Sequence, residues 1–168
     1  MINIPSGGGG GGGGGGKLGP GASQPLVRLK SQIEAGSEKT GVPVNLIAAV
    51  IWQESRGNPN ASSNNGKDTG LMQINDNTFA EMRRKHPIIG PNKNEPATNI
   101  LGGSFYLADM FAIFKTWPLA LRAYNSGPNS VDPSDPNKTP NGIGDPNYVR
   151  LVQKHEQIIR TGNGVLDP

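Results

Sequence analysis

The sequence predicts a mainly α-helical domain, and two observations support this prediction. Apolar residues recur at intervals of three and four along several segments, the spacing that places them on one face of a helix. Prolines stand at the start of segments of this kind, where the first helical turn needs no backbone N–H from them. These prolines are Pro25, Pro43, Pro96 and Pro118. A chain of 168 residues is long enough to form one such domain with a buried core.

Composition excludes several classes of function. The net charge is only +3, and no stripe of basic residues is interleaved with aromatic ones, so we expect no nucleic-acid partner. Without cysteine there is neither a disulfide framework nor a thiol nucleophile. His86 and His155 have no second ligand at a suitable spacing, so we expect no metal and no cofactor. The longest apolar run, residues 46–52, falls short of the roughly 18 residues that a membrane span requires.

The N-terminal segment differs in composition from the rest of the chain. Residues 1–6 carry no positive charge and no apolar stretch, so we predict no secretory signal peptide. Residues 7–16 are all glycine, which loses the most backbone entropy on ordering, and we expect a flexible tether over residues 1–24. The folded domain is expected over residues 25–161, followed by a frayed tail over residues 162–168.

Two helices are expected at the start of this domain. Leu26, Leu29 and Ile33 form an apolar stripe that predicts the first helix over residues 25–39. A glycine and a proline then separate it from a second helix, which is predicted over residues 43–55.

The second helix ends in a carboxylate on its apolar face. The stripe consists of Leu46, Ile47, Val50 and Ile51. Glu54 falls on the same stripe one turn later, so a glutamate points where a core residue is expected. Burial and the negative end of the helix dipole both disfavour the ionised form, which predicts a raised pKa for Glu54 and a role as general acid. The alternative is a solvated glutamate at a frayed helix end.

The remaining elements follow in chain order. Residues 56–69 are rich in asparagine, serine and glycine, which predicts a surface loop. Further helices are predicted over residues 78–85, 96–114, 118–125 and 147–160. Residues 129–147 form a long loop crowded with proline and polar residues, which we expect beside a cleft.

Four short motifs stand in a fixed order along the chain. They are Glu54-Ser55, Gly70-Leu71-Met72-Gln73, Asn99-Ile100 with Gly103 and Tyr106-Leu107, and Ala123-Tyr124-Asn125-Ser126-Gly127. In this order they resemble the soluble-type lytic transglycosylases, and the resemblance covers roughly residues 26–160. It implies a mainly α, lysozyme-like helical domain with a substrate cleft. Residues 68–75 are most similar to small members that accompany secretion and conjugation machines or phage particles.

The resemblance also implies an activity and a set of site residues. Glu54 would serve as the single general acid and base that cleaves the β-1,4 bond between N-acetylmuramic acid and N-acetylglucosamine in peptidoglycan. The C6 hydroxyl would then close on C1 to give a 1,6-anhydro end. The implied sugar-binding residues are Ser55, Met72, Gln73, Tyr124, Asn125 and Tyr148. For Met72 and Tyr124 the alternative is a purely structural place in the core.

Two other functions stay open from the sequence. A hydrolase similar to goose-type lysozyme would need a carboxylate to position water, and Asp68 and Asp76 are the candidates, although Asp68 would also suit a brace for the loop. The chain would alternatively be a non-catalytic, glycan-binding or structural component of a phage particle or secretion apparatus.

The expected partners and location follow from the resemblance. The substrate would be peptidoglycan glycan strands in the periplasm or cell wall. A phage particle, or a secretion or conjugation complex, would be a second partner through the N-terminal tether. Because no signal peptide is visible, delivery would depend on a phage particle, a holin or non-Sec secretion.

Overall fold

The computed structural model describes residues 16–168 and is mainly helical, as predicted. The expectations for residues 1–15 lie outside the described residues. The helices are α1 Gln24–Val27, α2 Lys30–Thr40, α3 Val44–Ser55, α4 Asp76–Lys85, α5 Pro96–Phe114, α6 Trp117–Ser126 and α7 Tyr148–Thr161. The strands are β1 Ser62–Ser63, β2 Asp68–Thr69 and β3 Ile74–Asn75, and a short 3-10 turn covers Pro140–Gly142.

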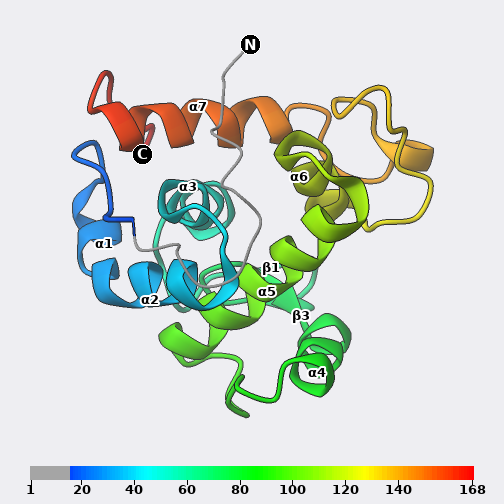
Figure 1. Cartoon of the computed structure of the whole chain (residues 1–168), viewed down its shortest axis with the longest axis horizontal. Helices are drawn as coiled ribbons and strands as arrows, with labels where there is room; N and C mark the ends of the chain where they lie inside the picture. Colours follow the sequence, from blue (N-terminus) through cyan, green and yellow to red (C-terminus); the bar gives the residue numbers. More distant parts are fainter. Residues whose placement is uncertain (1–15) are drawn as a thin grey trace.

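Helix α3 lies at the centre of the domain, with α7 on one side and α2 on the other (Figure 1). It is apolar around most of its circumference, and a helix of this kind is stable only when it is buried. Its buried apolar residues are Val44, Leu46, Ile47, Ala48, Ala49, Val50, Ile51 and Trp52. Glu54 lies one residue before the end of this helix, so the packing of α3 determines where the Glu54 carboxyl is placed.

Helix α5 has the length and hydropathy of a membrane-crossing helix, although the sequence led us to expect no membrane span. In this fold it packs against α2, α4 and α6. Two glycines let its neighbours approach closely. A Cβ added to Gly102 would lie 3.3 Å from the Phe79 ring in α4, and one added to Gly103 would lie 2.8 Å from the Met72 Cβ. Gly102 therefore allows α4 to pack closely against α5, and Gly103 does the same for the segment that follows β2.

The helix predicted over residues 25–39 is divided in two. Leu29 adopts φ −101° and ψ 7°, outside the helical region, between the end of α1 and the start of α2. Both Leu26 and Ile33 nevertheless lie in the core, as their shared stripe predicts. The periodicity found the buried residues but did not show the break.

A small antiparallel sheet has the strand order β1-β2-β3, and its first two strands lie in the segment predicted to be a surface loop over residues 56–69. Strands of two residues are too short to show the alternation of apolar and polar residues that identifies a strand in a sequence. The register pairs Asp68 of the central strand with Ser63 on one side and with Asn75 on the other. The sheet thereby fixes the backbone position of Asp68.

Both ends of the described chain pack onto the helices. The backbone N–H groups of Leu18 and Gly19 donate to the side chains of Glu34 and Asn45, at 2.9 and 2.8 Å. At the other end, Leu166 is buried and the Trp52 indole donates to the Asp167 carbonyl at 2.9 Å. The packed chain therefore extends beyond residues 25–161 in both directions, and the tail expected to fray is held against α3.

Candidate active site

A cleft of about 600 Å³ runs past the end of α3. Its lining residues come from the strands and the loops around them, from the carboxyl end of α6, and from α4 and α5. The lining residues with ionisable side chains are Glu54, Asp68, Glu81, Lys85, Tyr106 and Tyr124. A concave pocket with a few polar and ionisable side chains among apolar ones is the usual form of a ligand site.

Glu54 is half-buried and lines this cleft. Burial raises its pKa from about 4.5 to about 7. The hydrogen bond from the Tyr148 hydroxyl, 3.0 Å from Oε2, lowers the pKa, and the negative charge of Asp68 raises it. The direction agrees with the sequence-based expectation. A carboxyl with this pKa exchanges protons near neutral pH.

Tyr148 is the first residue of α7, which packs against α3, and its hydroxyl reaches the Glu54 carboxyl. It is almost completely buried, and burial raises the pKa of its phenol well above the usual range. The hydroxyl is therefore a proton-carrying donor to Glu54 throughout the neutral range. The sequence placed Tyr148 at the site only through the family resemblance.

Tyr124 is buried and hydrogen-bonded into the core. Its hydroxyl donates to the Met72 carbonyl at 2.7 Å, although part of the side chain still lines the cleft. Met72 itself has no exposed surface. Its side chain packs against α5 and lies 3.9 Å from the Ser104 hydroxyl. The expectation that Met72 contacts a sugar is therefore wrong for this structure, because the thioether fills the core instead.

Ser55 is also turned inward. Its hydroxyl lies 2.7 Å from the Leu71 carbonyl and accepts a hydrogen bond from the Gly57 N–H at 3.2 Å. The residue is buried, so it joins the end of α3 to the loop after β2 and presents no free group to a ligand. Its expected role as a sugar contact is replaced by a structural one.

Gln73 lines the cleft, but its amide is largely committed to the protein. Its Nε2 donates to the carbonyls of Ala61 and Gly70, at 2.9 and 2.8 Å, and its Oε1 accepts from the Ser63 hydroxyl. Gln73 also adopts a left-handed backbone, with φ 50°, which costs a non-glycine residue free energy. The amide therefore braces a strained turn.

Asn125 is the expected contact residue that keeps a donor for a ligand. Its Oδ1 accepts from the Asp145 N–H at 2.8 Å and from the Arg122 guanidinium. No hydrogen bond from its Nδ2 is formed within residues 16–168, and the residue is half-buried at the cleft. Its amide nitrogen can therefore donate to a polar group in the cleft.

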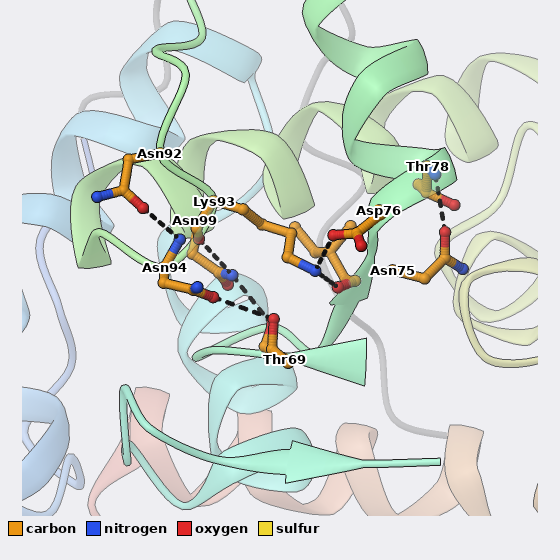
Figure 2. Close-up of polar contacts among 9 residues, drawn as sticks. Thr69, Asn75, Asp76, Thr78, Asn92, Lys93, Asn94 and Asn99 are labelled. Carbon is orange, nitrogen blue, oxygen red and sulfur yellow. Dashed lines mark hydrogen bonds and ion pairs between the residues drawn. The ribbon is translucent and has the colours of Figure 1, made fainter. Parts of the chain in front are cut away.

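The backbone between β2 and β3 is held by Asn99, a motif residue to which the sequence analysis gave no role. Its Oδ1 accepts from the Met72 N–H at 2.8 Å. Its Nδ2 donates to the Thr69 and Lys93 carbonyls at 3.1 and 2.9 Å, and Figure 2 shows Asn99 beside these two residues. A side chain on Gly70 would collide with this amide. The adjacent motif glycine is the sequence signal that a side chain approaches the backbone here.

The two aspartates proposed as assisting carboxylates differ in position. The Asp76 side chain is 92% exposed and pairs with Lys93 at 2.6 Å (Figure 2). Asp76 does not line the cleft, whereas the half-buried Asp68 does. Of the two, only Asp68 can contact a ligand beside Glu54. Within residues 16–168 no group of three potential metal ligands converges.

Comparisons with known proteins agree with this geometry. The family model described as the transglycosylase SLT domain matches residues 31–140. The X polypeptide of Escherichia coli is 36% identical over 89 residues, which are 49% of this chain and 51% of that protein. The membrane-bound lytic murein transglycosylase F of Pseudomonas fluorescens is 32% identical over 117 residues, which are 65% of this chain and 22% of that protein.

A solved structure is similar as well. The lytic transglycosylase Slt of Pseudomonas aeruginosa, in an inactive mutant with glutamate replaced by glutamine, superposes with a TM-score of 0.66 at 26% identity. The match covers 77% of this chain and 23% of that chain. The chain thus spans about half of the E. coli relative and about a quarter of the two larger proteins.

Proposed function

The chain belongs to the transglycosylase SLT domain family, and from this premise we propose that it is a peptidoglycan lytic transglycosylase. In the proposed reaction it cleaves the β-1,4 bond between N-acetylmuramic acid and N-acetylglucosamine and leaves a 1,6-anhydro end. The observation that carries the proposal is the Glu54 carboxyl, which lines the cleft and has a pKa raised to about 7.

Glu54 acts first as a general acid. With a pKa of about 7, about half of these carboxyls carry a proton at neutral pH. The proton passes to the glycosidic oxygen, the bond from C1 to that oxygen breaks, and the leaving sugar departs as an alcohol. The N-acetyl carbonyl of the muramic acid residue stabilises the positive charge at C1.

Glu54 then acts as a base. The carboxylate accepts the proton of the C6 hydroxyl while the C6 oxygen bonds to C1, which restores the starting acid and closes the 1,6-anhydro ring. The Tyr148 hydroxyl stabilises the carboxylate between the two steps, because it donates to Oε2. No water is consumed, so one carboxyl suffices.

The other site residues divide into two groups in this proposal. Asn125 binds the sugar through its free Nδ2. Ser55, Tyr124 and Gln73 act indirectly, since their hydrogen bonds hold the loop between β2 and β3 beside Glu54. The inactive glutamate-to-glutamine mutant of the P. aeruginosa protein supports a reaction that depends on a glutamate.

One observation favours a second candidate function. Asp68 lines the same cleft, is half-buried, and raises the pKa of Glu54 through its negative charge. In a hydrolase similar to goose-type lysozyme this carboxylate would position a water molecule for attack at C1. The lytic transglycosylase and the hydrolase release different products, so analysis of the products distinguishes the two functions.

The test is mass spectrometry of the soluble products released from peptidoglycan by wild type, Glu54→Gln and the control Glu38→Gln. Glu38 is an exposed glutamate of α2. We expect wild type and the control to release muropeptides about 18 mass units lighter than hydrolytic ones, without a reducing end. Glu54→Gln should release none.

Other results would change the assignment. Reducing muropeptides from wild type would identify a hydrolase, and Asp68→Asn would then be tested for loss of that activity. Binding of peptidoglycan by wild type without any product would identify a non-catalytic glycan-binding or structural protein.

The proposed setting follows from the substrate. The enzyme acts on the glycan strands of the periplasm or cell wall. We propose that it reaches them with a phage particle or through a secretion or conjugation complex. A pull-down with peptidoglycan and with the assembled particle or complex would test these partners separately.

A further inference from the structure

A buried arginine lies behind the active site. Arg122 projects from α6 and has no exposed surface. It forms no ion pair with a carboxylate in the described part of the chain, and its Nε and Nη1 groups are buried there without hydrogen-bond partners. Burial lowers the pKa of Arg122, and the negative charge of Asp145 offsets this only in part. A buried cation without a directly paired carboxylate and with two nitrogens lacking acceptors costs stability, and a hydrophobic side chain of similar shape is often no worse. This cost calls for a compensating role.

The remaining nitrogen of Arg122 holds the segment that leads into α7. Its Nη2 donates to the Asp145 carbonyl at 3.0 Å and to the Asn125 Oδ1. The same Asn125 oxygen accepts from the Asp145 N–H at 2.8 Å. The Asp145 carbonyl also accepts from the Tyr148 N–H at 3.0 Å. Arg122 and Asn125 together therefore fix both backbone groups of Asp145, and Asp145 fixes the backbone of Tyr148.

The packing around this contact leaves little freedom. Gly144 has a φ of +99°, and a side chain there would collide with Asn125 and Ser126. The Ser126 hydroxyl donates to the Ile143 carbonyl at 2.7 Å. Residues 143–145 are thus docked on the carboxyl end of α6, which places the first turn of α7 relative to the cleft.

The Arg122 charge also acts on the Tyr148 phenol. Burial, the Glu54 charge and Tyr124 raise the pKa of Tyr148, whereas the Arg122 charge lowers it. A more acidic hydroxyl is a stronger hydrogen-bond donor. The groups that act on Glu54 itself are Tyr148 from α7 and Asp68 from β2.

We propose that Arg122 is a positioning residue for the reaction proposed above: it holds Tyr148 against Glu54, and its buried charge strengthens the Tyr148 hydrogen bond to the carboxylate that forms when the proton leaves. This inference rests on the proposed function for its catalytic consequence. The effect of Arg122 on the pKa of the Glu54 carboxyl can be measured without any substrate.

The test combines Arg122→Met, Tyr148→Phe and the double variant. Methionine keeps an unbranched side chain of similar length without the charge. Arg28→Met is the matched control, because Arg28 is exposed on the surface. Three quantities are measured for each protein: kcat and KM on purified glycan strands, the pKa of the Glu54 carboxyl by carbon NMR, and the thermal midpoint. The Glu54 signal is assigned with Glu54→Gln.

We expect Arg122→Met to lower kcat about 10- to 100-fold, because a misplaced Tyr148 hydroxyl no longer stabilises the carboxylate that forms when the proton leaves. A rise in KM should be smaller and should come from Asn125, whose Oδ1 Arg122 also holds. The pKa of Glu54 should rise, since a hydrogen bond that favours the carboxylate is weakened. Tyr148→Phe should raise it as well. The double variant should resemble Tyr148→Phe alone, because the arginine acts through the tyrosine.

Independent effects of Arg122→Met and Tyr148→Phe on the pKa of Glu54 would overturn the inference, as would an unchanged pKa in Arg122→Met. If Arg122→Met does not fold, the same comparison uses Arg122→Lys, which keeps the charge but cannot reach both oxygens in the same geometry. A wild type that releases no product would refute the proposed function, while the NMR titration would still decide the role of Arg122.

Discussion

The raised pKa of Glu54 predicts an unusual dependence of stability on pH. A carboxyl whose pKa rises from about 4.5 in the unfolded chain to about 7 in the fold keeps its proton longer when folded. Between these two values the folded state binds more protons, so stability falls as the pH rises and levels off above pH 7. At about 1.4 kcal/mol per pH unit the whole interval would correspond to about 3.5 kcal/mol. Partial exposure of the carboxyl to solvent lowers the expected figure to about 3 kcal/mol.

Glu54→Gln removes this dependence. We expect the mutant and wild type to unfold with similar free energies near pH 4.5, and the mutant to be more stable by up to about 3 kcal/mol at pH 8. For a chain of this size that difference raises the thermal midpoint by about 6–12 °C. The measurement is urea unfolding of both proteins at half-unit pH intervals, with Glu38→Gln as the exposed control. A constant difference between mutant and wild type across this range would refute the reasoning, because it would mean that Glu54 titrates normally.

Three further predictions concern the loop that carries the site. Asp68→Asn removes a negative charge, so the pKa of Glu54 should fall and the alkaline limit of activity should move to lower pH, as a pH profile of kcat would record. Asn99→Leu leaves three backbone groups unpaired and should cost about 3 kcal/mol in urea unfolding. Gly103→Ala forces a Cβ against Met72 and should cost about 1–3 kcal/mol in the same assay.

Exposed positions provide the controls for these variants. Asn77→Ala, in the first turn of α4, should leave the free energy of unfolding within about 0.5 kcal/mol. An equal loss in Asn77→Ala and Asn99→Leu would contradict the importance of the three hydrogen bonds. If the alkaline limit of kcat moves to higher pH in Asp68→Asn, the Asp68 charge does not raise the pKa of Glu54 as assigned.

The sequence predicted the parts of the fold that depend on periodic burial. The stripe of α3 and the Pro96 start of α5 follow from residue spacing, and the raised pKa of Glu54 follows from the place of that residue on a buried stripe. The small sheet was not predicted, because strands of two residues show no alternation of apolar and polar residues. The break at Leu29 was not predicted either, because the apolar stripe continues across it.

The site was less predictable than the fold. Tyr148 could be placed only by resemblance, since 94 residues separate it from Glu54. Met72 and Ser55 were assigned to the sugar because their motif looks functional, yet both side chains serve the backbone around them. A motif shows that a set of residues is needed together, but it does not separate the residues that touch a ligand from those that hold others in place.

The loop between β2 and β3 has a consequence for how such a domain can change. Side chains from three different helices, Ser55 of α3, Asn99 of α5 and Tyr124 of α6, each bind its backbone. A substitution at any of them disturbs the other two, so this side of the cleft should tolerate almost no variation. The cleft wall formed by α4 and α5 is different, because its residues Lys85 and Ile113 are exposed and do not hold the backbone of this loop. New preferences for peptide stems or glycan modifications would therefore be selected most readily along that wall, while the chemistry beside the loop stays unchanged.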